Sequence, residues 1–281
     1  MNGKTKAKQR EVDWHVPLEG SWIPLCDGPW KGIGQAELVK SLGNLPLDDP
    51  HAWLALPGTE TIKDSRNIIA RVPRPGPADD GMLLKIFPVR GLRGTVQSGW
   101  RTSKARKGWE KAWTVLKRGF RTPTPRLALE RHAHGRLIES ALWVDWIEGW
   151  QLREFLKPWR RRPRSEAERK RCHEFLHRLG SYLRNLHDAG IIHRDFGGGN
   201  VLVSEKASGS EAFTLVDLNR AVVTRDPASW RARMLDLERV HLHPEDRQTF
   251  FAAYSLSQEE IRRWGHHYLE RAERYRRRSR R

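Results

Sequence analysis

The sequence has few cysteines and no long apolar segment. Its 281 residues include only two cysteines, Cys26 and Cys172, which are too few for a disulfide framework and indicate a reducing compartment. No apolar run approaches the roughly 20 residues that a membrane-spanning helix needs. Residues 1–11 are polar and basic, so we expect no signal peptide. These absences predict a cytoplasmic protein that is either soluble or bound peripherally to a membrane.

Acidic residues are scarce relative to basic ones. The chain has 52 Lys plus Arg against 34 Asp plus Glu, a formal net charge of +18 at pH 7. Such a charge attracts polyanions, and an anionic membrane surface, a phosphorylated glycolipid and nucleic acid all qualify. No nucleic-acid-binding motif accompanies the charge, which argues against nucleic acid. Two basic segments, 157–171 and 271–281, are open to two interpretations, namely solvated surface charge or contact with anionic lipid.

The most informative stretch runs from His193 to Val203 and continues at residues 214–218. It supplies Asp195, then Asn200 five positions later, and Asp217 after a short strand–turn–strand pattern. Phosphoryl transfer needs a carboxylate that accepts the proton of the attacking hydroxyl and oxygen ligands that hold Mg²⁺. We therefore assign Asp195 as the base, and Asn200 and Asp217 as Mg²⁺ ligands, in the layout of a kinase catalytic loop. The alternative is an ordinary polar turn followed by an ordinary acid at a strand end.

The residues before this motif favour the catalytic interpretation. Residues 174–189 predict an amphipathic helix that ends at Gly190, a residue type typical of helix C-termini. Its apolar positions recur at spacings of one, three and four: Phe175, Leu176, Leu179, Tyr182, Leu183 and Leu186. A helix, a glycine, a short strand, the motif and a hairpin follow one another in the order of a kinase C-lobe. Because the predicted elements and the motif agree with one another in this order, a chance occurrence of the motif is improbable.

Two segments also resemble a known family. Leu186–Asp195 (LHDAGIIHRD) and Val216–Ala221 (VDLNRA) are similar to the lipopolysaccharide core kinases, which phosphorylate heptose or 3-deoxy-manno-octulosonic acid (Kdo) sugars on lipid A. The resemblance is strongest over residues 186–221 and weaker toward both ends. It implies an ATP-dependent, Mg²⁺-dependent sugar kinase that acts at the inner face of the inner membrane. It does not indicate which sugar is the acceptor.

The resemblance also implies a fold and its division. We expect an α+β, bilobed protein-kinase-like fold, with an antiparallel N-lobe sheet, one main N-lobe helix and a shortened, mainly helical C-lobe. The expected regions are an extension packed on the N-lobe (1–56), the N-lobe (57–147), and the C-lobe with a basic tail (148–281). Three tryptophans of the extension, Trp22, Trp30 and Trp53, predict core packing, with presentation to a partner as the alternative.

Several N-lobe residues are candidates for nucleotide binding. Lys85 lies in the apolar strand 82–87, where a lysine is rarely buried without a partner. A kinase uses such a lysine to hold phosphates and pairs it with a helix glutamate, for which Glu110 is the best candidate. The alternative is two solvated charges. By position, the hinge groups facing adenine would be the carbonyl of Asp145 and the amide of Ile147, to within one residue.

The turn over the ATP phosphates is expected between two strands in residues 61–72, but this turn has no glycine. Lys63, Ser65, Arg66 and Asn67 could contact phosphate through their side chains instead. An exposed polar hairpin with no ligand is the alternative. The glycines at 197–199 also have two possible interpretations. They could make room for a bulky acceptor, or they could form a simple tight turn.

The residues after Asp217 favour a glycan or glycolipid acceptor over a protein. Asn219 stands where the common Asp-Phe-Gly motif has glycine, and no Ala-Pro-Glu motif follows. Only the residues from 218 to 281 remain, too few for the helices with which protein kinases bind a peptide. Two alternatives stay open. One is a kinase for a protein or a small metabolite, and the other is a pseudokinase-like basic module that binds anionic membrane or RNA.

Overall fold

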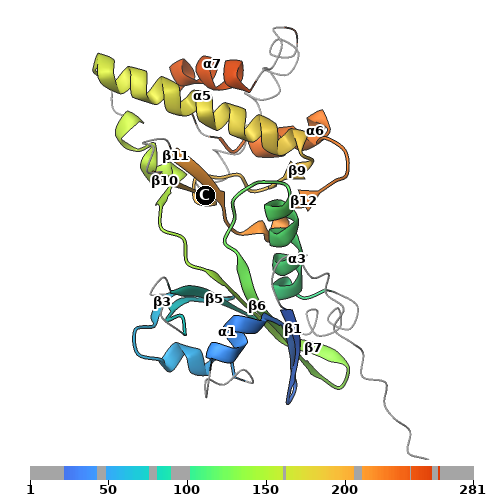
Figure 1. The fold of residues 1–281 in the computed structure, drawn as a ribbon. Helices are drawn as coiled ribbons and strands as arrows, with labels where there is room; N and C mark the ends of the chain where they lie inside the picture. The colour runs from blue at the N-terminus through green and yellow to red at the C-terminus, as the bar shows by residue number, and fades with distance from the viewer. Residues whose placement is uncertain are drawn as a thin grey trace, which may run out of the picture. The chain divides into compact units, whose positions relative to one another are not determined.

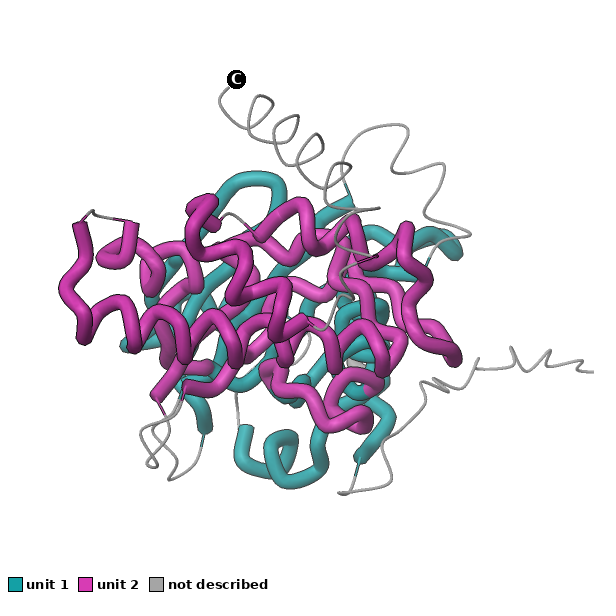
Figure 2. The backbone as a smooth tube through the Cα atoms, turned by 90° about the horizontal axis from the view of Figure 1, so that it is seen from above, with its two compact units in different colours: residues 1–113, 124–146 teal, residues 114–123, 147–281 magenta. Residues whose placement is uncertain are grey.

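The structure is a computed structural model that describes residues 22–42, 49–75, 81–89, 102–160, 163–205, 211–240, 242–254 and 259. The chain divides into two compact units (Figure 2). Unit 1 comprises residues 1–113 and 124–146, and unit 2 comprises residues 114–123 and 147–281. The basic tail 271–281 and two arginines of the segment 157–171, Arg161 and Arg162, lie outside the described residues.

Unit 1 is built on a seven-stranded sheet in the part of the chain that the structure describes (Figure 1). The order is β1-β2-β6-β7-β5-β4-β3, and all neighbours are antiparallel. The strands are β1 (Trp22–Asp27), β2 (Trp30–Gln35), β3 (Glu60–Asp64), β4 (Ile68–Val72), β5 (Met82–Pro88), β6 (Pro125–Ala133) and β7 (Arg136–Asp145). The helical elements are α1 (Ala36–Ser41), η1 (Ala52–Ala55) and α3 (Lys104–Lys117), whose last four residues belong to unit 2.

The side chains of β5 alternate between two cores. Met82, Leu84 and Ile86 are fully buried in one core, which also contains Trp53 and Trp143. The odd-numbered positions of β5 face the other side of the sheet, where Phe87 packs with Trp109 of α3. Because successive side chains of a strand point to opposite faces, Lys85 lies on the face that α3 covers.

Residues 22–56 are part of unit 1, and β1 and β2 form one edge of its sheet. Trp30 and Trp53 are buried, with 3% and 0% of their surface exposed. The ring of Trp22 meets that of Trp109 edge to face, with centroids 5.0 Å apart. The core-packing interpretation is confirmed for Trp30 and Trp53, and Trp22 packs against the core while partly buried. Composition alone did not indicate that this segment adds strands to the sheet.

The longest helix in the described part of unit 2 is α5 (Glu166–Asp188). It begins with a capping box, in which the Ser165 side chain accepts from the Glu168 amide and the Glu168 carboxylate accepts from the Ser165 amide. It ends as predicted before Gly190, whose φ of +72° is left-handed. The helix starts eight residues earlier than its apolar pattern indicates, because its first two turns are polar apart from Ala167 and Cys172.

The remaining elements of unit 2 surround this helix. Two short sheets have the orders β11-β10-β8 and β12-β9, and α7 packs against α5. The elements are β8 (Trp150–Gln151), α4 (Leu152–Phe155), η2 (Pro158–Arg160), β9 (Ile191–Ile192), β10 (Val201–Glu205), β11 (Glu211–Leu215), η3 (Leu218–Arg220), β12 (Val222–Val223), α6 (Trp230–Leu237) and α7 (Pro244–Ala253). Within the described residues, no helix is long and apolar enough to cross a membrane.

Two glycines with positive φ provide a matched test of the packing around the catalytic loop. A Cβ at Gly190 would lie 2.5 Å from the carbonyl oxygen of Thr224 and 2.6 Å from that of Asp226, whereas a Cβ at Gly119 would meet no atom within 4 Å. Gly119→Ala should cost only the backbone strain of about 1–2 kcal/mol. Gly190→Ala should lower the free energy of unfolding by about 1–3 kcal/mol more. Urea denaturation measures both, and equal losses would contradict the packing around Gly190.

Candidate active site

Residues 193–200 form the loop between β9 and β10 in unit 2, and this loop folds back on itself. The Gly197 amide donates to the Asp195 carbonyl at 2.6 Å, and the Asn200 amide donates to the Gly197 carbonyl at 2.9 Å. The side-chain nitrogen Nδ2 of Asn200 donates to the same Asp195 carbonyl at 2.9 Å. Asn200 is thereby held beside Asp195. Since Nδ2 is a donor, the oxygen Oδ1 of Asn200 is the atom that can ligate a cation.

His193 anchors the start of the loop. Its amide donates to Oδ2 of Asp236 in α6 at 2.7 Å, and its ring nitrogen Nε2 lies 2.9 Å from the carbonyl oxygen of Val216. A carbonyl can only accept, so Nε2 carries the proton. The Val216 amide in turn donates to the Asn200 carbonyl at 3.0 Å. These bonds fix the residue that precedes Asp217 against the loop.

Asp217 and Arg194 both adopt left-handed backbone conformations, with φ of 57° and 61°. A non-glycine residue pays about 1–2 kcal/mol for this conformation, and such strain gathers at functional sites. The Asp217 side chain is exposed, and Nδ2 of Asn219 donates to its Oδ1 at 2.9 Å. Asn219, the residue in place of the glycine, thus orients the carboxylate of Asp217. Asn200 is hydrogen-bonded to Asp195 and also to Val216, which precedes Asp217. These bonds hold Asp195 and Asp217 in the same region of unit 2.

The three glycines of the loop differ in their surroundings. A Cβ on Gly198 would lie 2.5 Å from the Cβ of Arg153 at the start of α4, and the Arg153 amide donates to the Gly198 carbonyl at 2.9 Å. A Cβ on Gly197 or Gly199 would meet its nearest neighbour only at 3.8 or 3.9 Å. The fold therefore requires glycine at position 198, whereas the space beside positions 197 and 199 is open to an added side chain.

The carboxylate of Asp195 has a partner that the sequence analysis missed. Nη1 of Arg239, just beyond α6, forms an ion pair with Oδ1 of Asp195. The side chains of Asp195 and Arg239 are 30% and 18% exposed. Two other arginines of this region, Arg194 in the loop and Arg220 in η3, are exposed.

Asp236 is buried beneath the loop and also contacts α5. Its side chain is 0% exposed, and its Oδ2 lies 3.3 Å from Nε2 of His187. Nδ1 of His187 lies 2.6 Å from the hydroxyl oxygen of Tyr254. Burial lowers the pKa of His187 below its ordinary 6.5, although the hydrogen bond and charge of Asp236 oppose this shift. Neutral His187 donates from Nε2 to the carboxylate and accepts the Tyr254 hydroxyl proton at Nδ1.

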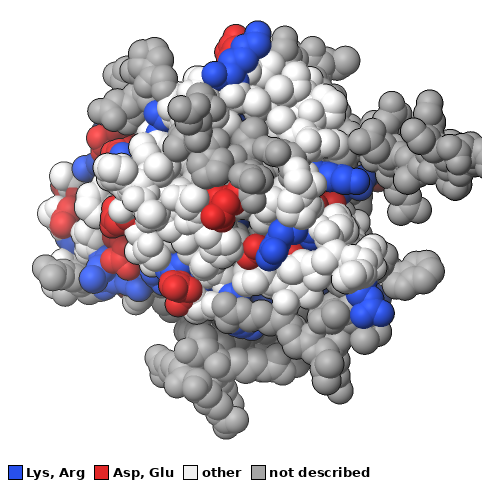
Figure 3. Space-filling view, turned by 90° about the horizontal axis from the view of Figure 1, so that it is seen from below, with Lys and Arg blue, Asp and Glu red and all other residues white. Residues whose placement is uncertain are grey.

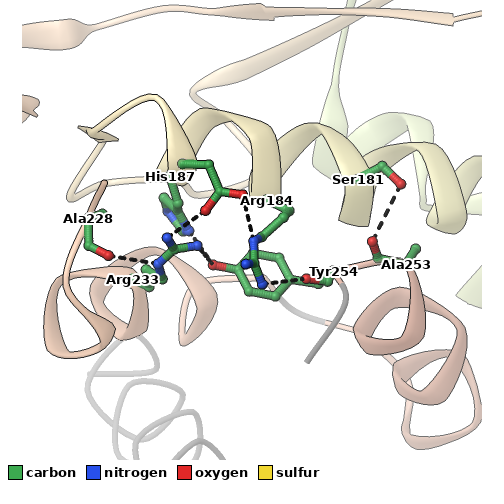
Figure 4. A network of polar contacts seen from close by, with 8 residues as sticks. Ser181, Arg184, His187, Ala228, Arg233, Ala253 and Tyr254 are labelled. Carbon is green, nitrogen blue, oxygen red and sulfur yellow. Dashed lines mark hydrogen bonds and ion pairs between the residues drawn. The ribbon is translucent and has the colours of Figure 1, made fainter. Parts of the chain in front are cut away.

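Arginines complete this network (Figure 4). Arg233 of α6 donates to Asp188 at 2.6 Å, to the Ala228 carbonyl at 2.8 Å and to the Tyr254 hydroxyl at 3.4 Å. Arg184 donates to Asp188 at 2.7 Å. Partial burial acts to raise the pKa of Asp188, but the bonds from Arg184 and Arg233 hold that pKa below its ordinary value. Burial raises the pKa of Tyr254 to about 12. The network ties α5, α6 and the end of α7 together.

In unit 1, Lys85 is half-buried in β5 and lies opposite Ile69 of β4 and Leu142 of β7. Glu110 of α3 accepts a hydrogen bond from Nε of Arg106 at 2.8 Å. Lys85 and α3 share one face of the sheet, which is the arrangement that an ion pair between Lys85 and Glu110 requires. That pair remains a prediction.

The turn between β3 and β4 is polar and largely exposed. The side-chain oxygen of Asn67 accepts from Nζ of Lys104, the first residue of α3, at 3.1 Å. The suggestion that this turn contacts phosphate through side chains remains a prediction.

The side chain of Asp145 has a structural role that the sequence did not reveal. Arg126 binds its carboxylate with two hydrogen bonds, of 2.7 and 2.6 Å, and Arg74 adds a third at 3.2 Å. The Asp145 amide donates to the Thr124 carbonyl at 2.9 Å. The proposed adenine contacts use backbone atoms of Asp145 and Ile147, so this ion pair does not conflict with them. The two assignments remain predictions.

A cavity of about 690 Å³ lies elsewhere on unit 2. Aromatic and acidic side chains line it, including Trp150, Trp159, Glu168 and Glu205. Glu168 belongs to the capping box of α5, and Glu205 pairs with Arg171 at 3.3 Å. None of Asp195, Asn200 or Asp217 lines this cavity, so we do not assign the chemistry to it.

Comparisons with known proteins bear on the family and the fold of the chain. A family model described as the lipopolysaccharide kinase (Kdo/WaaP) family matches residues 96–268. No curated protein sequence matches the chain significantly. A solved structure described as "WaaP in complex with acyl carrier protein" superimposes with a TM-score of 0.61 at 22% identity, covering 85% of this chain and 95% of that chain. At this identity the likeness concerns the fold alone, and the expected α+β, protein-kinase-like fold is confirmed.

The buried His187 predicts a dependence of stability on pH. Below about pH 6.5 the unfolded chain binds a proton at this position that the folded protein, with its lower His187 pKa, does not bind. The free energy of unfolding should therefore fall as the pH decreases, by at most about 1.4 kcal/mol per pH unit from this group.

Urea denaturation between pH 5 and 7.5 measures this contribution. His187→Gln should show a shallower pH dependence than the wild type, because its side chain does not titrate. His173→Gln, which changes an exposed histidine of the same helix, should retain the wild-type slope. Equal slopes for the wild type and His187→Gln would refute the assignment.

Proposed function

Since the chain belongs to the lipopolysaccharide kinase (Kdo/WaaP) family, whose model covers more than half of it, we propose that it phosphorylates a sugar of the lipopolysaccharide inner core, heptose or Kdo, with ATP. Membership of the family makes the chain a phosphotransferase of lipopolysaccharide biosynthesis. The observation that carries the proposal is the loop 193–200, in which Asn200 is hydrogen-bonded both to Asp195 and to Val216, the residue that precedes Asp217.

Asp195 is the base in this proposal. Its carboxylate accepts the proton of the acceptor hydroxyl as that oxygen forms a bond to the γ-phosphorus, and the bond between this phosphorus and the oxygen of ADP breaks. The partial exposure of the side chain leaves it accessible to an acceptor. The Gly197 amide and the side chain of Asn200 both bind the Asp195 carbonyl, so the base is positioned before the acceptor arrives.

The side-chain oxygens of Asn200 and Asp217 suit a magnesium ion, which prefers oxygen ligands. Oδ1 of Asn200 is oriented by the hydrogen bond of its neighbouring Nδ2, and the carboxylate of Asp217 is oriented by Asn219. When bound, Mg²⁺ would neutralise the phosphate charge that develops during transfer. The left-handed backbone of Asp217 supports this role, because strain of this kind gathers at functional sites.

For the nucleotide, we propose that Lys85 holds the phosphates and that Glu110 fixes Lys85. The backbone of Asp145 and Ile147 would bind adenine. The position of Lys85 on the face that α3 covers supports the first assignment. Family membership supports the use of ATP in general.

Two features support a glycolipid acceptor, namely the open space beside the catalytic loop and the positive net charge of the chain. Positions 197 and 199 have open space beside them, although only position 198 needs glycine for packing. A net charge of +18 favours the anionic inner face of the inner membrane, where we place the reaction. Figure 3 shows that basic and acidic side chains alternate on the described part of one face, rather than forming one basic patch. The basic tail 271–281 lies outside the described residues, so its contact with lipid rests on its sequence alone.

The solved WaaP structure contains acyl carrier protein, a partner that the sequence did not suggest. We include acyl carrier protein among the candidate partners of this chain, because the solved structure matches most of both chains.

Replacement of Asp195 tests the reaction directly. Asp195→Asn keeps the size of the side chain but removes the base, so phosphate transfer from radiolabelled ATP to purified core glycolipid should fall by at least about 10²-fold. Glu174→Gln, a change of an exposed acid on α5, should leave transfer unchanged. Thermal unfolding should show that both variants are folded. Full activity of a folded Asp195→Asn protein would disprove the assignment.

The same preparation separates the alternatives. Transfer to aminoglycosides or proteins, but not to core sugars, would make the chain a kinase with another acceptor. If calorimetry detected no Mg·ATP binding, a basic binding module would be favoured, and salt-sensitive binding to RNA or anionic vesicles would identify its ligand.

A further inference from the structure

Asp236 and Arg239 lie one helical turn apart at the C-terminal end of α6. The Arg239 amide donates to the Asp236 carbonyl at 3.0 Å, so the helical geometry continues past Leu237. Residues three apart on a helix share one face. Both side chains reach the catalytic loop, where Asp236 binds the His193 amide and Arg239 binds the carboxylate of Asp195. One turn of chain thus contacts two loop positions that are themselves two residues apart.

The loop itself provides no other cation beside its base. Residues 193–200 contain one arginine, Arg194, and its side chain is exposed. Phe196 is fully buried, and Gly197 has no side chain. The positive charge that pairs with the Asp195 carboxylate comes instead from Arg239, more than forty residues later in the chain.

The surroundings make this contact stronger than a surface ion pair. Arg239 is 18% exposed and Asp195 is 30% exposed, so water screens the two charges only in part. The planar guanidinium group gives its hydrogen bonds a fixed direction. Arg239 binds Oδ1 of Asp195, and the second oxygen, Oδ2, is then directed by that bond.

We propose that Arg239 is a positioning residue for phosphoryl transfer. It orients the Asp195 carboxylate through Oδ1 so that Oδ2 accepts the proton of the sugar hydroxyl, and it places a fixed positive charge beside the transferring phosphoryl group. Fixed charges of this kind act without reorganisation during the reaction. The proposal rests on the role of Asp195 as base in the proposed function.

Kinetics of Arg239 variants test the proposal. Arg239→Met should lower kcat by about 10²-fold, with the KM for ATP changed little, because the nucleotide is bound by other residues. Arg239→Lys keeps the charge but loses the directed hydrogen bonds, so its kcat should lie between those of Arg239→Met and the wild type. Arg231→Met, a change of an exposed arginine on the same helix, should match the wild type.

Chemical rescue distinguishes positioning from a merely structural role. Guanidinium chloride, well below denaturing concentrations, should restore part of the kcat of Arg239→Ala. It should not raise the activity of Asp195→Asn or of the wild type. Circular dichroism and thermal unfolding establish that each variant is folded.

The outcomes separate this proposal from the assignment of Asp195. A folded Arg239→Met enzyme with wild-type kcat, beside an inactive Asp195→Asn enzyme, would overturn the role of Arg239 alone. A raised kcat for Arg239→Met would also overturn it, since the ion pair would then restrain the base. Loss of kcat in a folded variant with no rescue by lysine or guanidinium would overturn the positioning role and leave Arg239 a structural residue of the site. An active Asp195→Asn enzyme would overturn the proposed function itself.

Discussion

The catalytic loop depends on one buried carboxylate, that of Asp236. This side chain is fully buried and accepts hydrogen bonds from the His193 amide and from the ring of His187. Both donors reach the same oxygen, Oδ2, and because a buried carboxylate is costly without partners, the two donors and the carboxylate constrain each other. With its amide fixed, His193 can reach the carbonyl of Val216. The position of the loop relative to the hairpin that bears Asp217 follows from this chain of contacts.

This anchoring explains how two strained residues persist in the site. Arg194 and Asp217 both have positive φ, a conformation that costs each of them about 1–2 kcal/mol. Arg194 follows the anchored His193, and Asp217 follows Val216, which is held by both His193 and Asn200. Surrounding hydrogen bonds therefore determine the backbone on one side of each strained residue. The strain is maintained by packing that extends through His187 to α7.

The sequence predicted site residues that lie close together along the chain. It did not predict contacts between residues that are far apart along the chain. Asp195, Asn200 and Asp217 could be selected because their spacing reflects one loop and one hairpin. Arg239 could not, because its contact with Asp195 arises from the packing of α6 and leaves no local pattern. The first two turns of α5 were missed because they lie on the surface and lack an apolar stripe. The strands β1 and β2 were missed because their pairing with β6 is a tertiary property.

The central claim is that Asp195 catalyses phosphorylation of the lipopolysaccharide core. Mass spectrometry of the core oligosaccharide tests it most directly, in cells that lack this gene and are complemented with either wild type or Asp195→Ala. The account predicts that one phosphate is lost in the deletion strain and restored only by the wild type. Restoration by Asp195→Ala would contradict the catalytic role, and an unchanged core in the deletion strain would contradict the acceptor.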